Sequence, residues 1–211
     1  MAQRAIHYLF GTILSEHIEL KDKKRFLLGH VIPDAIEKYD RNKSHFETRT
    51  DGMEYYDFHD FYEKYQNLIF EDDLYLGYYM HLVEDDFYRE IFYKYRLGKT
   101  IALEEVPILH TDYNILNSYI IDTYKIENIL GKSFEEKGED IFKIGSFRVN
   151  EFLEEMSHDF IEKTEGTTVF VTEEMVDEFV ETYIPLAIRE VQNIKSGKSG
   201  LKASDFAWRI N

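Results

Sequence analysis

A histidine and an aspartate one helical turn apart, His81 and Asp85, are the residues of this sequence best placed to do chemistry. They lie in the stretch from Leu74 to Tyr95, LYLGYYMHLVEDDFYREIFYKY, which is rich in apolar and aromatic residues. Positions four apart share one face of a helix, so both side chains point to the same side. An imidazole and a carboxylate so placed can bind one divalent cation, which also compensates a carboxylate on a largely apolar face.

The same pair has a second interpretation, as an internally hydrogen-bonded His–Asp pair in a hydrophobic core. Gly77, one turn before His81, leaves room for another backbone or a substrate to approach closely. Asp86 lies about 100° further round the helix than Asp85, so we expect it to face solvent or the surroundings of the ligands.

We expect helices to position these side chains. A chain of 211 residues with only three prolines and eleven glycines is typical of a mainly helical protein. Apolar spacing predicts helices at 2–19, 23–30, 56–68, 74–95, 111–130, 146–163 and 173–195. A polar loop is expected at 40–54, and a surface excursion at 131–145. We predict an all-α, single-domain multi-helix bundle over residues 1–195 with a metal site between helices, followed by a flexible link and a short amphipathic tail at 196–211.

Three further candidate ligands lie outside the central stretch. His7 lies beside the apolar face of the first predicted helix and can face inward. Asp34 follows Pro33 in a turn, since the residue before a proline is pushed out of the α region. His45 lies in the predicted polar loop, directly before a phenylalanine.

Four segments occur in the order AIHYLFGTIL, FLLGHVIPDAIE, KSHF and LGYYMHLVEDDFY, within residues 4–95. In this order they resemble the motifs of the zinc-dependent phospholipase C family, whose fold is shared by the fungal single-strand nucleases. The resemblance implies an all-α domain that binds zinc ions between its helices and hydrolyses phosphoester bonds. It implies that His45, His81 and Asp85 hold one zinc. It also implies that His7 and a bridging Asp85 hold a second zinc, and that Asp34 is a ligand or the general base.

The chain departs from the secreted members of that family in two respects. Their mature N-terminal amine is a metal ligand, whereas here several residues precede the first motif without a visible signal peptide. The later ligands of a third zinc have no clear match, and His110 with Asp112 is the nearest substitute. We therefore expect one or two zinc ions per chain.

Two other functions remain open from the sequence. The doublet His59–Asp60, with His30 upstream and Asp112 downstream, could belong to an HD-type metal phosphohydrolase. The chain could also be a helical metal-binding or interaction protein without catalytic activity.

Composition limits the partners of the chain. A balance of 25 basic against 41 acidic residues gives a formal net charge of −16, which repels nucleic acid polymers. No cysteine is present, so thiolate metal sites are excluded and the cytoplasm is the expected location. No run of 18 apolar residues occurs, so we expect no stable membrane insertion. The resemblance implies a small phosphoester as substrate, which bound dications can hold despite the negative charge of the chain.

Overall fold

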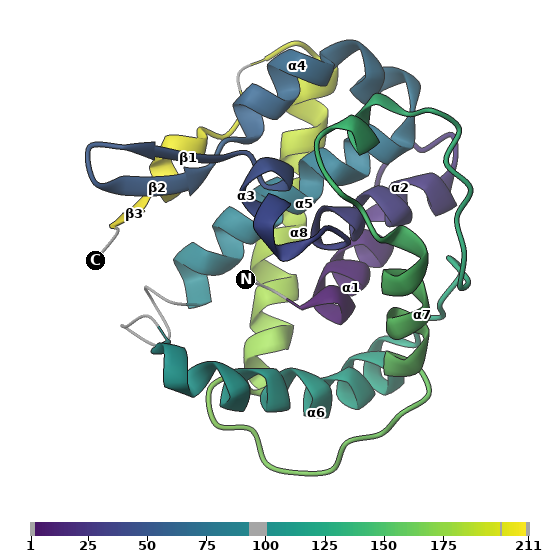
Figure 1. The fold of residues 1–211 in the computed structure, drawn as a ribbon, viewed down its shortest axis with the longest axis vertical. Helices are drawn as coiled ribbons and strands as arrows, with labels where there is room; N and C mark the ends of the chain where they lie inside the picture. Colours follow the sequence, from purple (N-terminus) through teal and green to yellow (C-terminus); the bar gives the residue numbers. More distant parts are fainter. Residues whose placement is uncertain (1–2, 93–100, 199, 210–211) are drawn as a thin grey trace.

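The structure, a computed structural model, describes residues 3–92, 101–198 and 200–209. Within these residues the chain forms a multi-helix fold with one small antiparallel sheet, so the predicted all-α class is confirmed (Figure 1). The α-helices are α1 (Arg4–Ser15), α2 (Lys23–Gly29), α3 (Arg41–Ser44), α4 (Phe58–Glu71), α5 (Asp73–Arg89), α6 (Val106–Tyr124), α7 (Val149–Asp159) and α8 (Glu173–Lys195). Short 3-10 turns lie at η1 (Ile32–Asp34), η2 (Lys38–Asp40), η4 (Leu103–Glu105), η5 (Asp140–Lys143) and η6 (Ala203–Phe206).

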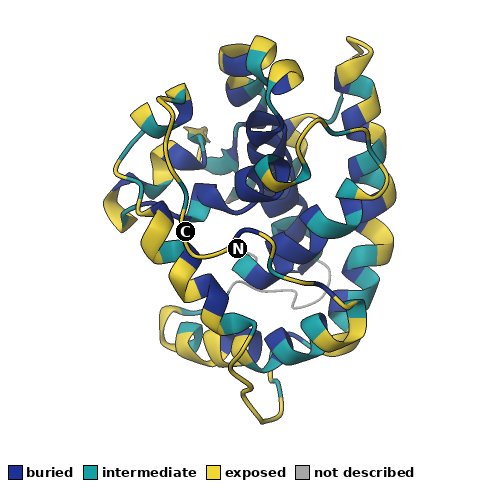
Figure 2. Cartoon of the chain, turned by 90° about the vertical axis from the view of Figure 1, so that its right-hand side faces the viewer, coloured by how far each residue is buried: buried dark blue, intermediate teal, exposed yellow. Residues whose placement is uncertain are grey.

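Helix α5 is the centre of the fold. Every residue from Asp73 to Tyr88 is buried, and α1, α2, α4 and α8 all pack against it, as the dark blue centre of Figure 2 shows. Its N-terminus is capped by Asp72, whose side chain accepts a hydrogen bond of 3.0 Å from the backbone N–H of Leu74. A π-type turn at 90–92 follows the helix, and the predicted helical residues 93–95 lie outside the described residues.

Helices α2 and α5 cross at two glycines. A Cβ atom on Gly77 would lie 2.1 Å from the carbonyl oxygen of Phe26, and one on Gly29 would lie 2.0 Å from the carbonyl oxygen of Leu74. Because no side chain fits at either position, the two backbones come into direct contact. The close backbone approach expected at Gly77 is therefore present, and its partner is α2.

Polar contacts join the beginnings of the same two helices. Asp22 caps α2 by accepting a hydrogen bond of 3.1 Å from the backbone N–H of Arg25, and its own N–H donates to Asp73. Arg25 Nε donates to Oδ1 of Asp72 over 2.7 Å. The register of α2 on α5 is thus fixed both at the glycine crossing and at the helix ends.

The prediction of a polar loop at 40–54 is wrong. The segment forms helix α3 and most of a hairpin, in which β1 (Glu47–Thr50) pairs antiparallel with β2 (Met53–Tyr56). Asp51 and Gly52 make the turn with φ of 53° and 74°, the conformation that an Asp-Gly pair favours in a two-residue hairpin loop. The Asp-Gly pair indicates a turn in the sequence, but the charged residues on either side of it obscure the alternating pattern that is typical of strands.

The predicted link and tail, 196–211, lie against the rest of the fold where they are described. Strand β3 (Trp208–Arg209) pairs with β2 as the third strand of the sheet, in the order β1-β2-β3. The ring of Phe206 lies 6.4 Å from the rings of Phe58 and Phe87, so η6 packs on α4 and α5.

Helix α6 begins at Val106, earlier than the predicted residue 111, because Pro107 is well suited to a first helical turn. Its Asp112 is buried and accepts hydrogen bonds from the backbone N–H groups of Val169 and Phe170, over 2.9 and 2.5 Å, and of Val171 over 3.1 Å. The segment 167–172 is irregular and is held to α6 by this carboxylate.

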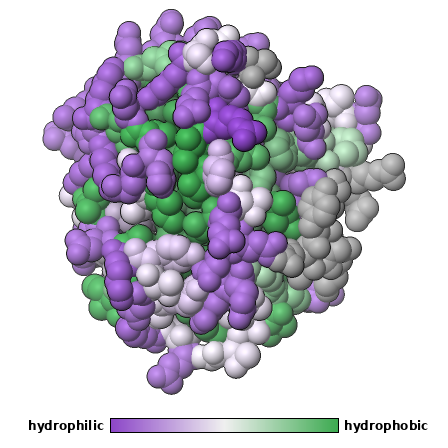
Figure 3. All heavy atoms as spheres, turned by 180° about the vertical axis from the view of Figure 1, so that it is seen from behind, coloured by the Kyte–Doolittle hydropathy of each residue, from purple (hydrophilic) through white to green (hydrophobic). Residues whose placement is uncertain are grey.

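The outer surface is mainly polar. Hydrophilic residues cover much of the face seen in Figure 3, with apolar atoms visible between them. Within the described ranges no helix is both long enough and apolar enough to cross a membrane.

The helix crossing leads to a stability prediction. Gly77→Ala places a methyl group against the carbonyl of Phe26, so we expect a loss of about 1–3 kcal/mol in the free energy of unfolding. This loss should outweigh the gain of roughly 0.5–1 kcal/mol from higher helix propensity. Urea denaturation measures the difference, and Asn67→Ala on the exposed side of α4 is the control, with an expected change within about 0.5 kcal/mol. An unchanged or raised stability of Gly77→Ala would show that the helices do not touch there.

Candidate metal centre

Five side chains that the sequence predicted as ligands lie together beside the middle of α5. His81 and Asp85 come from α5 itself, His7 from α1, Asp34 from the turn η1, and His45 from the residue after α3. Four of these side chains are 0–1% exposed, and Asp34 is 12% exposed. Four separate segments of the chain therefore deliver ligand-type atoms to one buried point.

The first group consists of His45, His81 and Asp85. The Nε2 atoms of the two histidines are 3.3 Å apart, and Oδ2 of Asp85 lies 3.4 Å from His45 Nε2 and 3.8 Å from His81 Nε2. Ligands at about 2.0–2.2 Å from a tetrahedral zinc ion stand roughly 3.3–3.6 Å from one another. The spacing of these three atoms is close to that of one face of such a tetrahedron.

The second group lies next to the first. His7 Nε2 is 3.6 Å from Oδ2 of Asp34 and 3.6 Å from Oδ1 of Asp85. The rings of His7 and His81 stack with their centroids 4.0 Å apart, and ligand atoms of His7, Asp34 and His81 lie within 4.8 Å of one another. Since Asp85 approaches His45 through one oxygen and His7 through the other, it is placed to bridge two ions.

Hydrogen bonds to the outer nitrogens orient two of the imidazoles. His81 Nδ1 lies 3.0 Å from the carbonyl oxygen of His30, and His45 Nδ1 lies 3.1 Å from the carbonyl oxygen of Arg41. A carbonyl only accepts, so Nδ1 of His81 carries the proton and donates. Nδ1 of His45 also lies 2.9 Å from the Ser44 hydroxyl, and its contact with the Arg41 carbonyl favours the same tautomer. In the neutral rings, both Nε2 atoms then present lone pairs to the point where the carboxylates converge, which is the arrangement that metal-binding histidines adopt.

Glu84 is the functional residue that the sequence analysis missed. It is fully buried, with Oε1 2.9 Å from Nδ1 of His7 and Oε2 2.7 Å from Nε2 of His30. It thereby fixes the ring of His7 with Nε2 toward Asp34 and Asp85. One signal was available, because the stretch 73–88 contains several carboxylates but no lysine or arginine to neutralise them.

The buried carboxylates determine the charge of the cluster. Burial disfavours an imidazolium, yet the charges of Glu84, Asp85 and Asp34 outweigh it and raise the pKa of His7 to about 9. Burial also works against ionisation of Asp34, but the Arg41 guanidinium, 2.6 Å away, and the nearby imidazoles hold the pKa of this carboxyl well below its usual range. The carboxylates thus attract positive charge, whether from a proton on His7 or from metal ions.

Asp86 corrects one expectation. It is fully buried and does not face solvent; its Oδ1 accepts a hydrogen bond of 3.1 Å from the backbone N–H of Tyr56. Burial raises the pKa of the Asp86 carboxyl well above its usual value. Asp86 does point to a different side of α5 than Asp85, but strand β2 and not water covers that side.

The remaining candidates lie elsewhere. His59 is half-buried and Asp60 exposed on α4, and neither belongs to a metal-capable group among the described residues. His110 is exposed on α6, and Asp112 bonds to loop backbone, so this pair does not extend the cluster. His30 contributes its carbonyl to His81 and its ring to Glu84, so it supports the cluster from behind.

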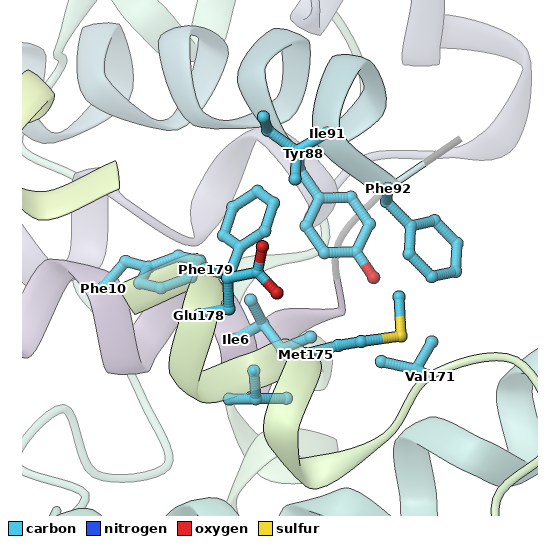
Figure 4. A pocket seen from close by; sticks show the side chains of 10 residues that line it. Ile6, Phe10, Tyr88, Ile91, Phe92, Val171, Met175, Glu178 and Phe179 are labelled. Atoms are coloured by element: carbon cyan, nitrogen blue, oxygen red, sulfur yellow. The ribbon is translucent and has the colours of Figure 1, made fainter. Parts of the chain in front are cut away.

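An apolar pocket beside the cluster is part of the core. Figure 4 shows the ring of Phe179 beside that of Tyr88, with Ile6 and Met175 below them, at the meeting of α1, α5 and α8. No histidine lines this pocket, and its volume is about 10 Å³. It has no room for a substrate.

No family model matches the sequence, no curated protein matches it, and no solved structure matches the fold. The assignment of the centre therefore depends on its geometry, and the family resemblance stays a prediction.

Glu84 provides a direct test of this geometry. Glu84→Gln retains the size of the side chain and removes the charge that holds His7, so we expect zinc affinity to fall by about 10–100-fold. Competition titration with a zinc-binding dye measures the affinity, and circular dichroism checks that the helices are retained. Glu181→Gln on the exposed side of α8 is the matched control and should bind zinc like the unchanged protein. Equal affinity for both variants would contradict the role of Glu84.

Proposed function

We propose that the chain is a zinc-dependent hydrolase of small phosphoesters, in which His7, Asp34, His45, His81 and Asp85 hold one or two zinc ions. The observation that carries the proposal is the convergence of three imidazole Nε2 atoms and two carboxylates on one buried point, with the outer nitrogen of each ring held by another group. The motif resemblance of residues 4–95 supports the reaction class.

The residues present fit zinc well. Nitrogen and oxygen ligands at these spacings suit zinc, and a chain without cysteine offers no competing thiolate. His45, His81 and Asp85 would hold one ion, and His7 with Asp34 and the second oxygen of Asp85 would hold the other. Zinc ions at such a site act as Lewis acids, lower the pKa of a coordinated water and stabilise charge on a phosphoryl group.

Asp34 is the candidate general base. It is the one of the five ligand-type residues with measurable exposure, so it can contact both the cluster and an incoming water. The ion pair with Arg41 keeps its carboxylate ionised, which is the form that binds a metal or accepts a proton, but it also lowers the basicity of this carboxylate, so the ligand role is the better supported of the two. Asp34 also lies 3.3 Å from His45 Nε2, so its position is fixed from both sides.

The net charge of −16 favours a small substrate over a nucleic acid polymer, and the cytoplasm remains the predicted location.

Hydrolysis of chromogenic phosphomonoesters and phosphodiesters tests the function. We expect turnover that a chelator abolishes and that zinc, manganese or cobalt restores, because the ligands are mixed nitrogen and oxygen. The assay covers about pH 5 to 9, where imidazole and metal-activated water titrate. Bound metal without any turnover in this range would favour a non-catalytic metal-binding protein.

Asp85→Asn tests the bridging assignment. It keeps the side-chain shape but removes the charge that lets two cations lie close together, so activity should fall by at least about a hundredfold. The helices should persist in circular dichroism. Asp60→Asn is the control, since Asp60 is exposed on α4 and belongs to the HD-type alternative. Loss of activity in Asp60→Asn with retention in Asp85→Asn would favour that alternative.

A further inference from the structure

A pocket of about 500 Å³ opens beside the metal centre, between the N-terminal end of α1, helix α6 and helix α7. Figure 1 shows α6 running below the N-terminal end of α1, with α7 at one side. Of the five ligand-type residues, only Asp34 lines it, together with Arg41. Because the other four are 0–1% exposed, Asp34 is where this pocket meets the cluster.

One face of α6 forms a wall of the pocket. Val106, Leu109, His110, Tyr113 and Asn114 are spaced by three and four residues, so they share this face. Leu109 and Tyr113 are buried, and the Tyr113 hydroxyl is 2.9 Å from that of Tyr88, which fixes the wall to α5. His110 and Asn114 are exposed and present polar side chains to the pocket.

Two arginines line the pocket, and each is paired with a carboxylate. Arg41 donates to Asp34 through one terminal nitrogen, and a planar guanidinium can bind a carboxylate and a phosphoryl oxygen together. The second arginine, Arg4, is held by Asp159 and by Glu155, the latter at 3.0 Å, so its charge is compensated. The wall of α6 and the neighbouring Phe152 contain no acidic residue, lysine or arginine.

We propose that this pocket binds a small phosphomonoester, with the phosphoryl group between Arg41 and the cluster and an uncharged, partly aromatic organic group along α6 against Phe152. This substrate class rests on the proposed hydrolase function. The other four ligand-type side chains are 0–1% exposed, so a phosphoryl group reaches the cluster at Asp34 and carries its one organic group out along this pocket. A volume of about 500 Å³ is within the usual range for small-molecule sites and is too small for a polymer or a two-chain lipid.

His110 and Asn114 select the organic group in this arrangement. Both are exposed residues of the α6 wall, whereas Asp34 and Arg41 lie where the pocket meets the cluster, so in this arrangement they contact the organic part of the ester and not the phosphoryl group. Removing either side chain therefore changes affinity for an organic phosphate and leaves affinity for inorganic phosphate unchanged.

Phenylphosphonate, a phosphomonoester analogue that cannot be hydrolysed, tests the proposal on the full chain supplied with zinc. We expect the imidazole resonances of His110, identified in NMR spectra by their absence in His110→Gln, to shift on titration. Those of the exposed residues His17 and His158 should stay in place. Asn114→Trp fills the pocket and should weaken phenylphosphonate on the order of tenfold or more, which corresponds to about 1.4 kcal/mol. Inorganic phosphate should bind this variant as before.

Asn67→Trp on the exposed side of α4 is the matched control and should bind phenylphosphonate normally. Unshifted His110 resonances, equal phenylphosphonate affinity in Asn114→Trp, or no binding to the zinc-loaded chain would each overturn the pocket assignment. Elemental analysis and ester hydrolysis on the same sample separate the two proposals. A chain with zinc and turnover but without these effects retains its function with a different substrate pocket, whereas a chain without zinc loses both.

Discussion

The contact between α2 and α5 at Gly29 and Gly77 is the constraint on which the candidate metal centre depends. Because the two backbones are in direct contact, the position of α2 on α5 is fixed. His30, which follows the end of α2, therefore lies against the side of α5. From there the His30 carbonyl accepts from Nδ1 of His81, and the His30 ring reaches Glu84. Two glycines that bind no metal themselves therefore set the orientation of two of the three candidate metal-binding imidazoles, one directly and one through Glu84.

Buried charge is the second constraint. Asp34, Asp85 and Glu84 lie within one cluster, and an uncompensated carboxylate in a core is costly. Arg41 compensates Asp34, and the histidines compensate the others only if they carry protons or share a cation. The donor set of the cluster fits a divalent metal, which would compensate these carboxylates.

Much of this arrangement could be predicted from the sequence. The helical spacing of His81 and Asp85 and the turn at Pro33 indicated that these residues face inward, and the structure brings them together with His7 and His45. The depth of burial could not be predicted, because an amphipathic pattern shows that one side is polar but not whether water or protein covers it. For that reason the pattern left Asp86 either at solvent or around the ligands and gave no sign of the role of Glu84, although both are buried against neighbouring elements. As an aspartate, Asp112 could bind a metal or accept hydrogen bonds from a loop. The structure shows the second role, because three backbone N–H groups of the loop donate to it.

Anomalous diffraction at the zinc absorption edge, from crystals of the chain grown with zinc, tests the central claim most directly. The account predicts one or two peaks at this cluster, the first within about 2.0–2.2 Å of Nε2 of His45, Nε2 of His81 and a carboxylate oxygen of Asp85. A second peak, where present, should lie beside His7 and Asp34. A map without any peak at the cluster, with the imidazoles still held by His30, Arg41 and Glu84, would contradict it.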